Sequence, residues 1–320
     1  MAGMRQIRFG AVGRIQVLRL VLAAVLLAGA SNPGGGAATP QRTFPSPEQA
    51  VEALVAAARQ EGARTLLEVL GPEGRALVRS GDRVADQRGR ARFLAAFDEF
   101  HAIEMAGPDQ ATLVVGPERW PMPIPLVREG GAWRFDTRAG AQEILDRRIG
   151  RNELTVIEIC RAYVTAQRDY AAMDPLGTGR HEFAQRFAST AGTRDGLYWP
   201  AKPGEEESPL GPLVARARAE GYGGAKTREK PRPYQGYSYR ILTRQGAHAP
   251  GGPASYVVDG QMTGGFALLA FPAKYGQSGV MTFIVNQVGI VYQKNLGPNT
   301  AALARGITEY DPDPTWTAVE

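Results

Sequence analysis

The segment Leu154–Val164, which reads LTVIEICRAYV, carries the clearest structural signal in this chain of 320 residues. Its apolar side chains, among them Val156, Cys160 and Tyr163, recur every three to four positions. That spacing places them on one face of an α-helix, which we expect to run from Arg138 to about Met173. A helix of this length with one apolar face needs a second layer of structure to cover that face.

Cys160 is the only cysteine of the chain, so an internal disulfide is excluded. It lies on the apolar face of the predicted helix, and free cysteines are among the most buried residue types. A nucleophilic cysteine needs a nearby histidine, and none of the three histidines is close to it in sequence. We therefore expect a packed, inert thiol.

Helices and then short strands precede this segment. Ser46-Pro47-Glu48-Gln49 has the serine cap, early proline and later glutamine that open a helix, and we expect Gly62 to close it. The elements expected next are helices at Thr65–Leu70 and Arg90–Glu104, and strands at Ala111–Val115, Ile124–Arg128 and Ala132–Asp136. Glu129-Gly130-Gly131 forms a hairpin turn between the last two strands. Prolines around Ile124 predict that the middle strand is an edge strand or starts late.

Small helices and further strands follow the long helix. The elements expected are helices at Gln185–Ala191 and Val214–Glu220, and strands at Ser238–Thr243, Gly265–Phe271, Val280–Asn286 and Ile290–Gln293. Asn286-Gln287-Val288-Gly289 supplies a tight turn in which Gly289 can take a positive φ. The long helix is expected to cover these strands.

Together these elements predict an α+β fold of two domains, each with helices packed on a small antiparallel sheet. The first domain is expected at residues 46–150 and the second at residues 151–320, and the long helical segment joins them. Gly150, inside that segment, is the position at which the helix would break.

The first 30 residues have the layout of a secretory signal peptide. Four arginines precede the apolar run Leu20–Ala28, and the small residues that follow it allow cleavage after Ala30 or Ala38. Because the run is shorter than the roughly 20 residues that span a bilayer, we expect no membrane span after cleavage. Residues 31–45, rich in Gly, Ala and Pro, are expected to be flexible. The mature protein would be periplasmic or secreted.

Composition narrows the function classes. The apolar fraction is 43% and the charged fraction 22%, values that exclude a fibrous or multi-span membrane protein. The formal charge is +5, but removing the four arginines of residues 1–30 from the 37 basic residues leaves 33 against 32 acidic ones. A nearly balanced mature chain lacks the clustered cations of a nucleic-acid binder.

Patterns typical of metal, cofactor and serine chemistry are weak or missing. His101, His181 and His248 are too widely spaced to place two imidazoles on one helical face, so no metal site is expected. Ser278 lies in Gly276-Gln277-Ser278-Gly279, which lacks the spacing of a nucleophile elbow. The loop Gly221–Thr227 has Ala225 where a phosphate-binding loop has glycine. We expect no cofactor.

One loop combines charged and aromatic residues in a way that suits a binding site. Arg194, Asp195, Tyr198 and Trp199 lie in RDGLYWP, a composition that could hold a sugar or a peptide. The alternative is that Asp195 and the glycine after it form a turn while the two aromatics cover the sheet.

Arg151 and Glu153 could form an ion pair at the junction of the two domains. Glu205-Glu206-Glu207 is most simply a solvated loop.

Several motifs in order resemble an uncharacterised bacterial exported family, the domain of unknown function numbered twenty-nine fifty. They are GRNE from Gly150, CRAYV from Cys160, RDGLYWP from Arg194, SPLGPL from Ser208, GGFAL from Gly264 and GVMTFIVNQ from Gly279. The resemblance covers the chain from about Ser46 to its end and implies no activity. Val288 departs from the acidic residue expected in its turn.

Two more distant resemblances concern shape. Helices followed by a small sheet that ends at Gly131–Asp136 resemble the nuclear transport factor 2-like fold. The helix from Arg151 and the sheet that ends near Val291 are similar to the globular domains of pilins and pseudopilins. Charged residues such as Arg147 and Glu158 on that helix argue against filament assembly through it.

These observations predict an exported protein of the cell envelope that acts as a non-catalytic binding or assembly module. Its partner would be an envelope protein or polymer. The alternative is a hydrolase of an envelope polymer that uses acids such as Asp195 and Glu182. An enzyme would show a pocket with convergent acids of shifted pKa, and an assembly module an exposed apolar or aromatic patch.

Overall fold

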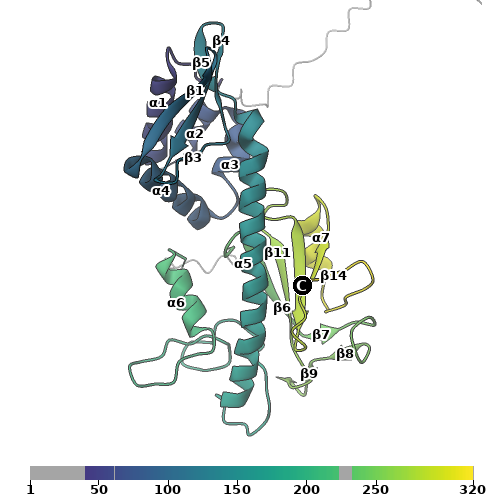
Figure 1. The fold of residues 1–320 in the computed structure, drawn as a ribbon. Helices are drawn as coiled ribbons and strands as arrows, with labels where there is room; N and C mark the ends of the chain where they lie inside the picture. The colour runs from purple at the N-terminus through teal and green to yellow at the C-terminus, as the bar shows by residue number, and fades with distance from the viewer. Residues whose placement is uncertain (1–39, 61, 223–232, 320) are drawn as a thin grey trace, which may run out of the picture. The chain divides into compact units, whose positions relative to one another are not determined.

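The computed structural model describes residues 40–60, 62–222 and 233–319, and these residues form a mixed α and β fold (Figure 1). The expected signal peptide and most of the segment expected to be flexible, residues 31–45, lie outside the described residues. Where that segment is described, Phe44 forms two backbone hydrogen bonds with Trp133, at 2.7 and 2.8 Å. The Gln41 amide donates to Val69 and Phe135, so ordered contacts begin ahead of Ser46.

The first half of the fold packs helices against an antiparallel sheet. The helices are α1 (Pro47–Arg59), α2 (Ala63–Leu70), the short η1 (Pro72–Gly74) and α3 (Arg75–Val78), and α4 (Arg83–Glu99). The strands are β1 (His101–Gly107), β2 (Gln110–Val115), β3 (Trp120–Pro121), β4 (Leu126–Glu129) and β5 (Ala132–Phe135). Their order is β1-β2-β4-β5, and β3 pairs with β2. The Ser46 hydroxyl caps α1 as predicted, by accepting a hydrogen bond from the backbone of Gln49.

Two predictions for this half were wrong, and a third was confirmed in one of its two alternatives. The helix expected to reach Glu104 ends at Glu99, because Phe100 takes an extended conformation and His101 opens β1. Strand β4 starts late, at Leu126, which confirms one of the two predicted alternatives, and it is not an edge strand, since it pairs with both β2 and β5. The α1 helix ends at Arg59, and Gly62 precedes α2 instead of closing α1.

Helix α5 (Thr137–Met173) runs without a break for 37 residues. Gly150 does not interrupt it, and the predicted domain boundary at residues 150 and 151 therefore falls inside a continuous helix. Thr137, Gly140 and Leu145 are buried near its start, and a second buried face begins at Asn152. One helix thus contributes to the packing of both halves of the fold.

The second half places α5 and short helices against another antiparallel sheet. Its helices are α6 (Gly211–Ala219) and α7 (Thr300–Gly306), and its main strands are β6 (Tyr237–Leu242), β11 (Ala267–Pro272), β12 (Met281–Asn286), β13 (Tyr292–Asn295) and β14 (Thr317–Ala318). The order is β14-β13-β12-β11-β6. Two small ribbons are β7 (Arg244–Gln245) with β8 (Ala254–Ser255) and β9 (Val257–Val258) with β10 (Gln261–Met262).

The helix expected at Gln185–Ala191 does not form. That stretch instead pairs with a later segment: Ala188 bridges Tyr198, and the Ser189 N–H donates to the Tyr198 carbonyl at 2.8 Å. Predictions for the strands and for α6 were close to the observed bounds. Gly289 has a φ of +93°, as the predicted tight turn requires.

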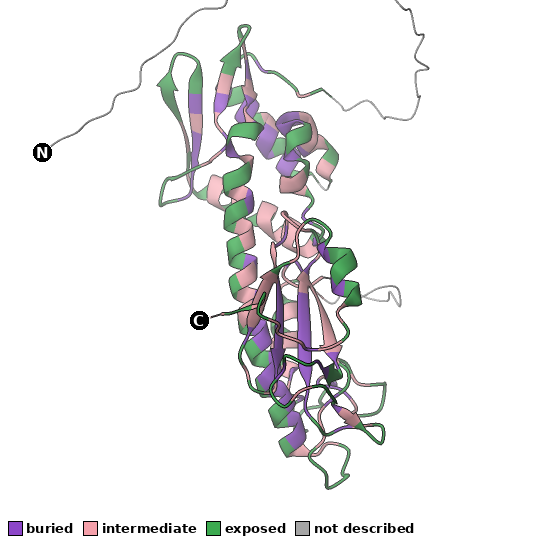
Figure 2. Ribbon diagram, turned by 90° about the vertical axis from the view of Figure 1, so that its right-hand side faces the viewer, coloured by how far each residue is buried: buried purple, intermediate pink, exposed green. Residues whose placement is uncertain are grey.

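The buried apolar side chains form two clusters. One includes Trp133 and Phe135 of the first half, and the other includes Cys160 and Tyr163 of α5 with the strands of the second half. Figure 2 shows buried stretches, in purple, in both halves of the fold. Cys160 is fully buried, and burial raises the pKa of its thiol to about 12. All described residues belong to one compact unit, and the division into two domains stays a prediction.

The described part of the chain contains no helix with the length and hydropathy needed to cross a membrane.

Two glycines of α5 give a paired test of this packing. A Cβ at Gly140 would lie 2.2 Å from the Pro123 carbonyl oxygen, whereas one at Gly150 would meet nothing within 4 Å. Gly140→Ala should therefore destabilise the protein by about 2–3 kcal/mol through overpacking. Gly150→Ala, in an exposed helix interior, should stabilise it by about 0.5–1 kcal/mol. Chemical denaturation measures both, and equal effects of the two changes would contradict the close contact at Gly140.

Candidate functional site

A cavity with a volume of about 580 Å³ borders α4. We call it the α4 cavity. Its inner wall is apolar and includes Leu54, Ala58, Leu66, Phe93, Ile124 and Ile144. These residues come from α1, α2, α4, the segment before β4, and α5. The volume lies within the range of roughly 300–1,000 Å³ that is usual for small-molecule sites.

Helix α4 explains why the space is open. Although it has 17 residues and an apolar stripe, none of its residues is buried. Phe93 and Ala96 pack against the first cluster and at the same time line the cavity. The side of α4 that faces the core is therefore only half covered by protein atoms.

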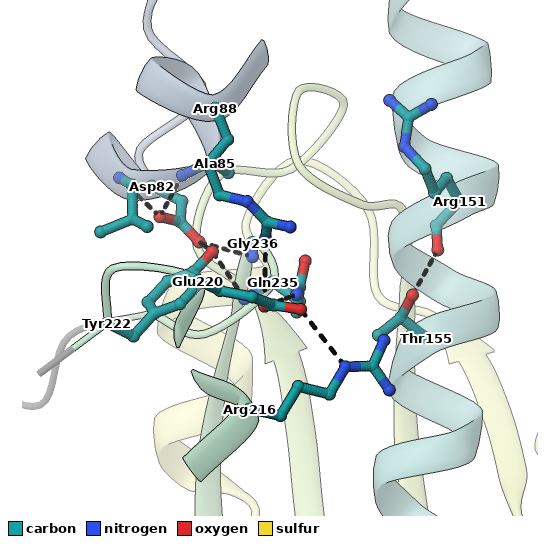
Figure 3. A network of polar contacts seen from close by, with 11 residues as sticks. Asp82, Ala85, Arg88, Arg151, Thr155, Arg216, Glu220, Tyr222, Gln235 and Gly236 are labelled. Atoms are coloured by element: carbon teal, nitrogen blue, oxygen red, sulfur yellow. Dashed lines mark hydrogen bonds and ion pairs between the residues drawn. The ribbon is translucent and has the colours of Figure 1, made fainter. Parts of the chain in front are cut away.

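The start of α4 is fixed by Asp82, whose contacts Figure 3 shows. Asp82 is 2% exposed. One carboxylate oxygen accepts hydrogen bonds from the N–H groups of Val84 and Ala85, at 3.1 and 3.0 Å, and so caps the helix. The other oxygen accepts from the Tyr222 hydroxyl at 2.8 Å and from the Gly236 N–H at 2.9 Å. Asp82 thereby joins α4 to two segments of the second half.

Glu220 forms the next part of this polar network (Figure 3). Its carboxylate pairs with Arg88 at 3.0 Å and with Arg216 at 3.3 Å, and it accepts from the Gln235 amide at 2.6 Å. All four side chains line the α4 cavity. The network therefore forms one polar edge of the cavity, and the charge of Glu220 is shared by two arginines.

Asp86 and Arg148 lie at another edge of the cavity. The Arg148 guanidinium donates to the carbonyls of Ala76 and Leu77, at 2.9 and 2.5 Å. The Asp86 carboxylate accepts from the Ser80 N–H, at 3.1 Å for the nearer oxygen. Burial raises the pKa of Asp86 and lowers the pKa of Arg148. Both acids of the cavity wall are thus already engaged by protein groups.

Sequence reasoning did not identify the α4 cavity. The one signal was the run RGRAR at Arg88–Arg92, directly before Phe93, which puts arginines on a helix that also carries an apolar stripe. These arginines meet those of α5 and α6 at the cavity only in the folded chain.

The predicted site loop forms a compact turn. The Asp195 carboxylate accepts from the backbone and hydroxyl of Thr190, at 2.7 and 2.9 Å, and from the Thr193 hydroxyl at 2.8 Å. It also pairs with Arg186 at 3.1 Å. Partial burial raises its pKa, but these hydrogen bonds and the arginine outweigh that effect and lower the pKa below its ordinary value.

The aromatics of this loop pack against protein. Trp199 is buried, with the Arg194 guanidinium over its ring at 5.3 Å, and Tyr198 is half-buried, with Arg218 over its ring at 5.3 Å. These contacts agree with the alternative in which a turn places the aromatics against the sheet. A binding role for Arg194, Asp195, Tyr198 and Trp199 stays a prediction.

A second cavity of about 290 Å³ brings Asp195 and Glu182 to one place. Tyr170 and Arg186 line it too. Burial, and then the nearby Asp174, raises the pKa of Glu182, and one of its carboxylate oxygens is buried without a hydrogen-bond partner among the described residues. The cavity thus contains two carboxyl groups whose pKa values shift in opposite directions.

Arg151 and Glu153 do not form the ion pair that the sequence suggested. Residues two positions apart on a helix point in different directions. The Glu153 carboxylate instead accepts from the N–H groups of Val280 and Met281, at 2.8 and 2.9 Å, where β12 begins.

The histidines lie apart from each other in the fold. His101 stacks on Phe97, with the ring centroids 3.8 Å apart, and His248 pairs with Asp311 at 3.0 Å. No cluster of three or more His, Cys, Asp or Glu side chains suited to a metal ion occurs in the part of the chain that the structure describes.

Comparison with known proteins gives a family and no activity. No curated protein and no solved structure matches the chain significantly, so the likeness to nuclear transport factor 2-like and pilin folds stays a prediction. A family described as "Protein of unknown function (DUF2950)" matches residues 41–319, which is most of the chain. The protein therefore belongs to this family.

Proposed function

We propose that the protein is an exported, non-catalytic binding module of the cell envelope and that it binds its ligand in the α4 cavity. The observation that carries this proposal is the α4 cavity itself, which has a volume of about 580 Å³, an apolar wall and a polar edge. Apolar pockets with a few placed polar groups are the usual form of a small-molecule site.

The chemistry of the cavity wall favours binding over catalysis. Glu220 is engaged by Arg88, Arg216 and Gln235, and Asp86 is hydrogen-bonded to Ser80. A general acid or base needs a carboxyl or imidazole that can reach a substrate proton. Glu220 is held by three side chains and Asp86 by a backbone N–H group, so we propose that neither acts as an acid or base.

The ligand site can be tested by filling it. Gly89 lines the α4 cavity, and a Cβ there would meet no atom within 4 Å. Gly89→Phe should reduce binding of the neutral fluorescent probe N-phenyl-1-naphthylamine at least tenfold, because the new ring occupies the apolar space. Ala91→Phe, on the same helix but outside the cavity wall, is the matched control. Absence of probe binding to the unchanged protein, or equal effects of both variants, would reject the α4 cavity as the site.

Export is supported by the basic start, the short apolar run and the small residues within residues 1–38. Mass spectrometry of the protein recovered from the envelope fraction should show cleavage after Ala30 or Ala38. An intact Met1 on protein found in the cytoplasm would contradict export without affecting the ligand site.

A second candidate function is hydrolysis of an envelope polymer at the cavity of Glu182 and Asp195. The observation that favours it is the pair of opposite pKa shifts, because a protonated carboxyl can donate a proton to a leaving group while an ionised one activates water or attacks.

This candidate predicts that the protein releases reducing ends from purified peptidoglycan and that Glu182→Gln lowers the rate at least a hundredfold, the usual scale for losing a general acid. Glu205→Gln, in an exposed loop, should leave the rate unchanged. A preparation with no activity, or one in which both variants behave alike, would exclude catalysis by this pair.

A further inference from the structure

The edge of the α4 cavity carries far more positive than negative charge. Six arginines line the cavity, namely Arg88, Arg90, Arg92, Arg148, Arg151 and Arg216, against two carboxylates. We call these six residues the arginine rim. They come from α4, α5 and α6, so the fold collects at one edge cations that are distant in sequence.

Half of the arginine rim is already used by protein groups. Arg88 and Arg216 pair with Glu220, and Arg148 donates to two backbone carbonyls. Among the residues that the structure describes, the side chains of Arg90, Arg92 and Arg151 form no ion pair or hydrogen bond. In Figure 3 no dashed line joins the guanidinium of Arg151 to the other residues drawn, whereas Arg88 and Arg216 reach Glu220.

Arg92 and Arg151 line the same cavity, where their positive charges oppose each other. Burial lowers the pKa of Arg92, and the positive charges of Arg151 and Arg88 lower it further. Arg92 and Arg151 line the same cavity as Phe93, so the cations without a protein partner lie at the edge of the apolar space. An anion placed between them would relieve the repulsion and gain charge-assisted hydrogen bonds.

We infer that the ligand of the α4 cavity is a single-chain amphiphile with a carboxylate or phosphate head. Its apolar tail lies among Leu54, Leu66 and Ile124, and its anionic head contacts Arg92 and Arg151. This inference rests on the proposed function, because it requires that the α4 cavity is the ligand site. A neutral apolar compound would contact the apolar wall and leave the cations unpaired. A small anion would pair with the cations and leave the apolar wall without a contact.

The test compares three probes of equal chain length with one small anion. Dodecanoate, dodecyl phosphate, dodecanol and inorganic phosphate are titrated by calorimetry into the unchanged protein and into Arg92→Gln/Arg151→Gln. The two anionic amphiphiles should bind at least tenfold tighter than dodecanol, which corresponds to about 1.4 kcal/mol. The double variant should remove that preference and leave dodecanol binding within about twofold.

Arg83→Gln is the matched control, since it removes a charge from α4 outside the cavity wall. Thermal unfolding checks that each variant folds. The preference of dodecanoate over dodecyl phosphate, or the reverse, identifies the head group.

Each failure points to a different error. Equal binding of dodecanol and dodecanoate, or an equal loss in Arg83→Gln, overturns the inference about the head group. So does binding of inorganic phosphate as tight as that of dodecyl phosphate, because the tail would then contribute nothing. If none of these probes binds while N-phenyl-1-naphthylamine still does and Gly89→Phe blocks it, the site stands and the anionic ligand is wrong. If that neutral probe also fails to bind, the proposed function fails with it.

Discussion

The side chain of Asp82 accepts four hydrogen bonds in a place that is almost closed to water. Two of them cap α4, and the other two come from Tyr222 and Gly236 of the second half. A buried carboxylate that loses its partners carries a large desolvation cost, so these segments must stay together. The α4 cavity depends on these hydrogen bonds of Asp82. One of its walls begins at Asp82, and its polar edge is built from residues next to Tyr222 and Gly236.

The α4 cavity and the arginine rim have a common origin in how α4 packs. The helix is held at its start by Asp82 and rests on the first cluster through side chains that are only partly covered. A well-filled core would bury Phe93, and its partial exposure to an internal space is what creates an apolar wall. The same helix presents Arg88, Arg90 and Arg92 beside that wall, so apolar and cationic surfaces meet along one element.

Much of the fold could be predicted from local patterns, and the site could not. Helix α5 has a clear period over many residues, and strands such as β12 alternate in the expected way. The end of α4 was missed because Phe100 and Ile103 fit either a helix or a strand until β1 pairs with β2. The arginine rim was missed because Arg92, Arg151 and Arg216 are far apart in sequence, and no local pattern reports that three helices bring them together. Asp195 and Glu182 were named together as candidate acids of a hydrolase, and the cavity that they share appears only in the folded chain.

The continuity of α5 limits how this family can vary in length. Successive residues of an α-helix are related by a rotation of about 100°. One residue inserted between Leu145 and Asn152 would therefore turn the whole downstream face away from the strands while Gly140 stayed in place against Pro123. Insertions and deletions should therefore accumulate in the loops between strands and leave this stretch at constant length. The number of residues in this stretch of α5 therefore fixes the rotation between the face that packs on the first cluster and the face that packs on the second.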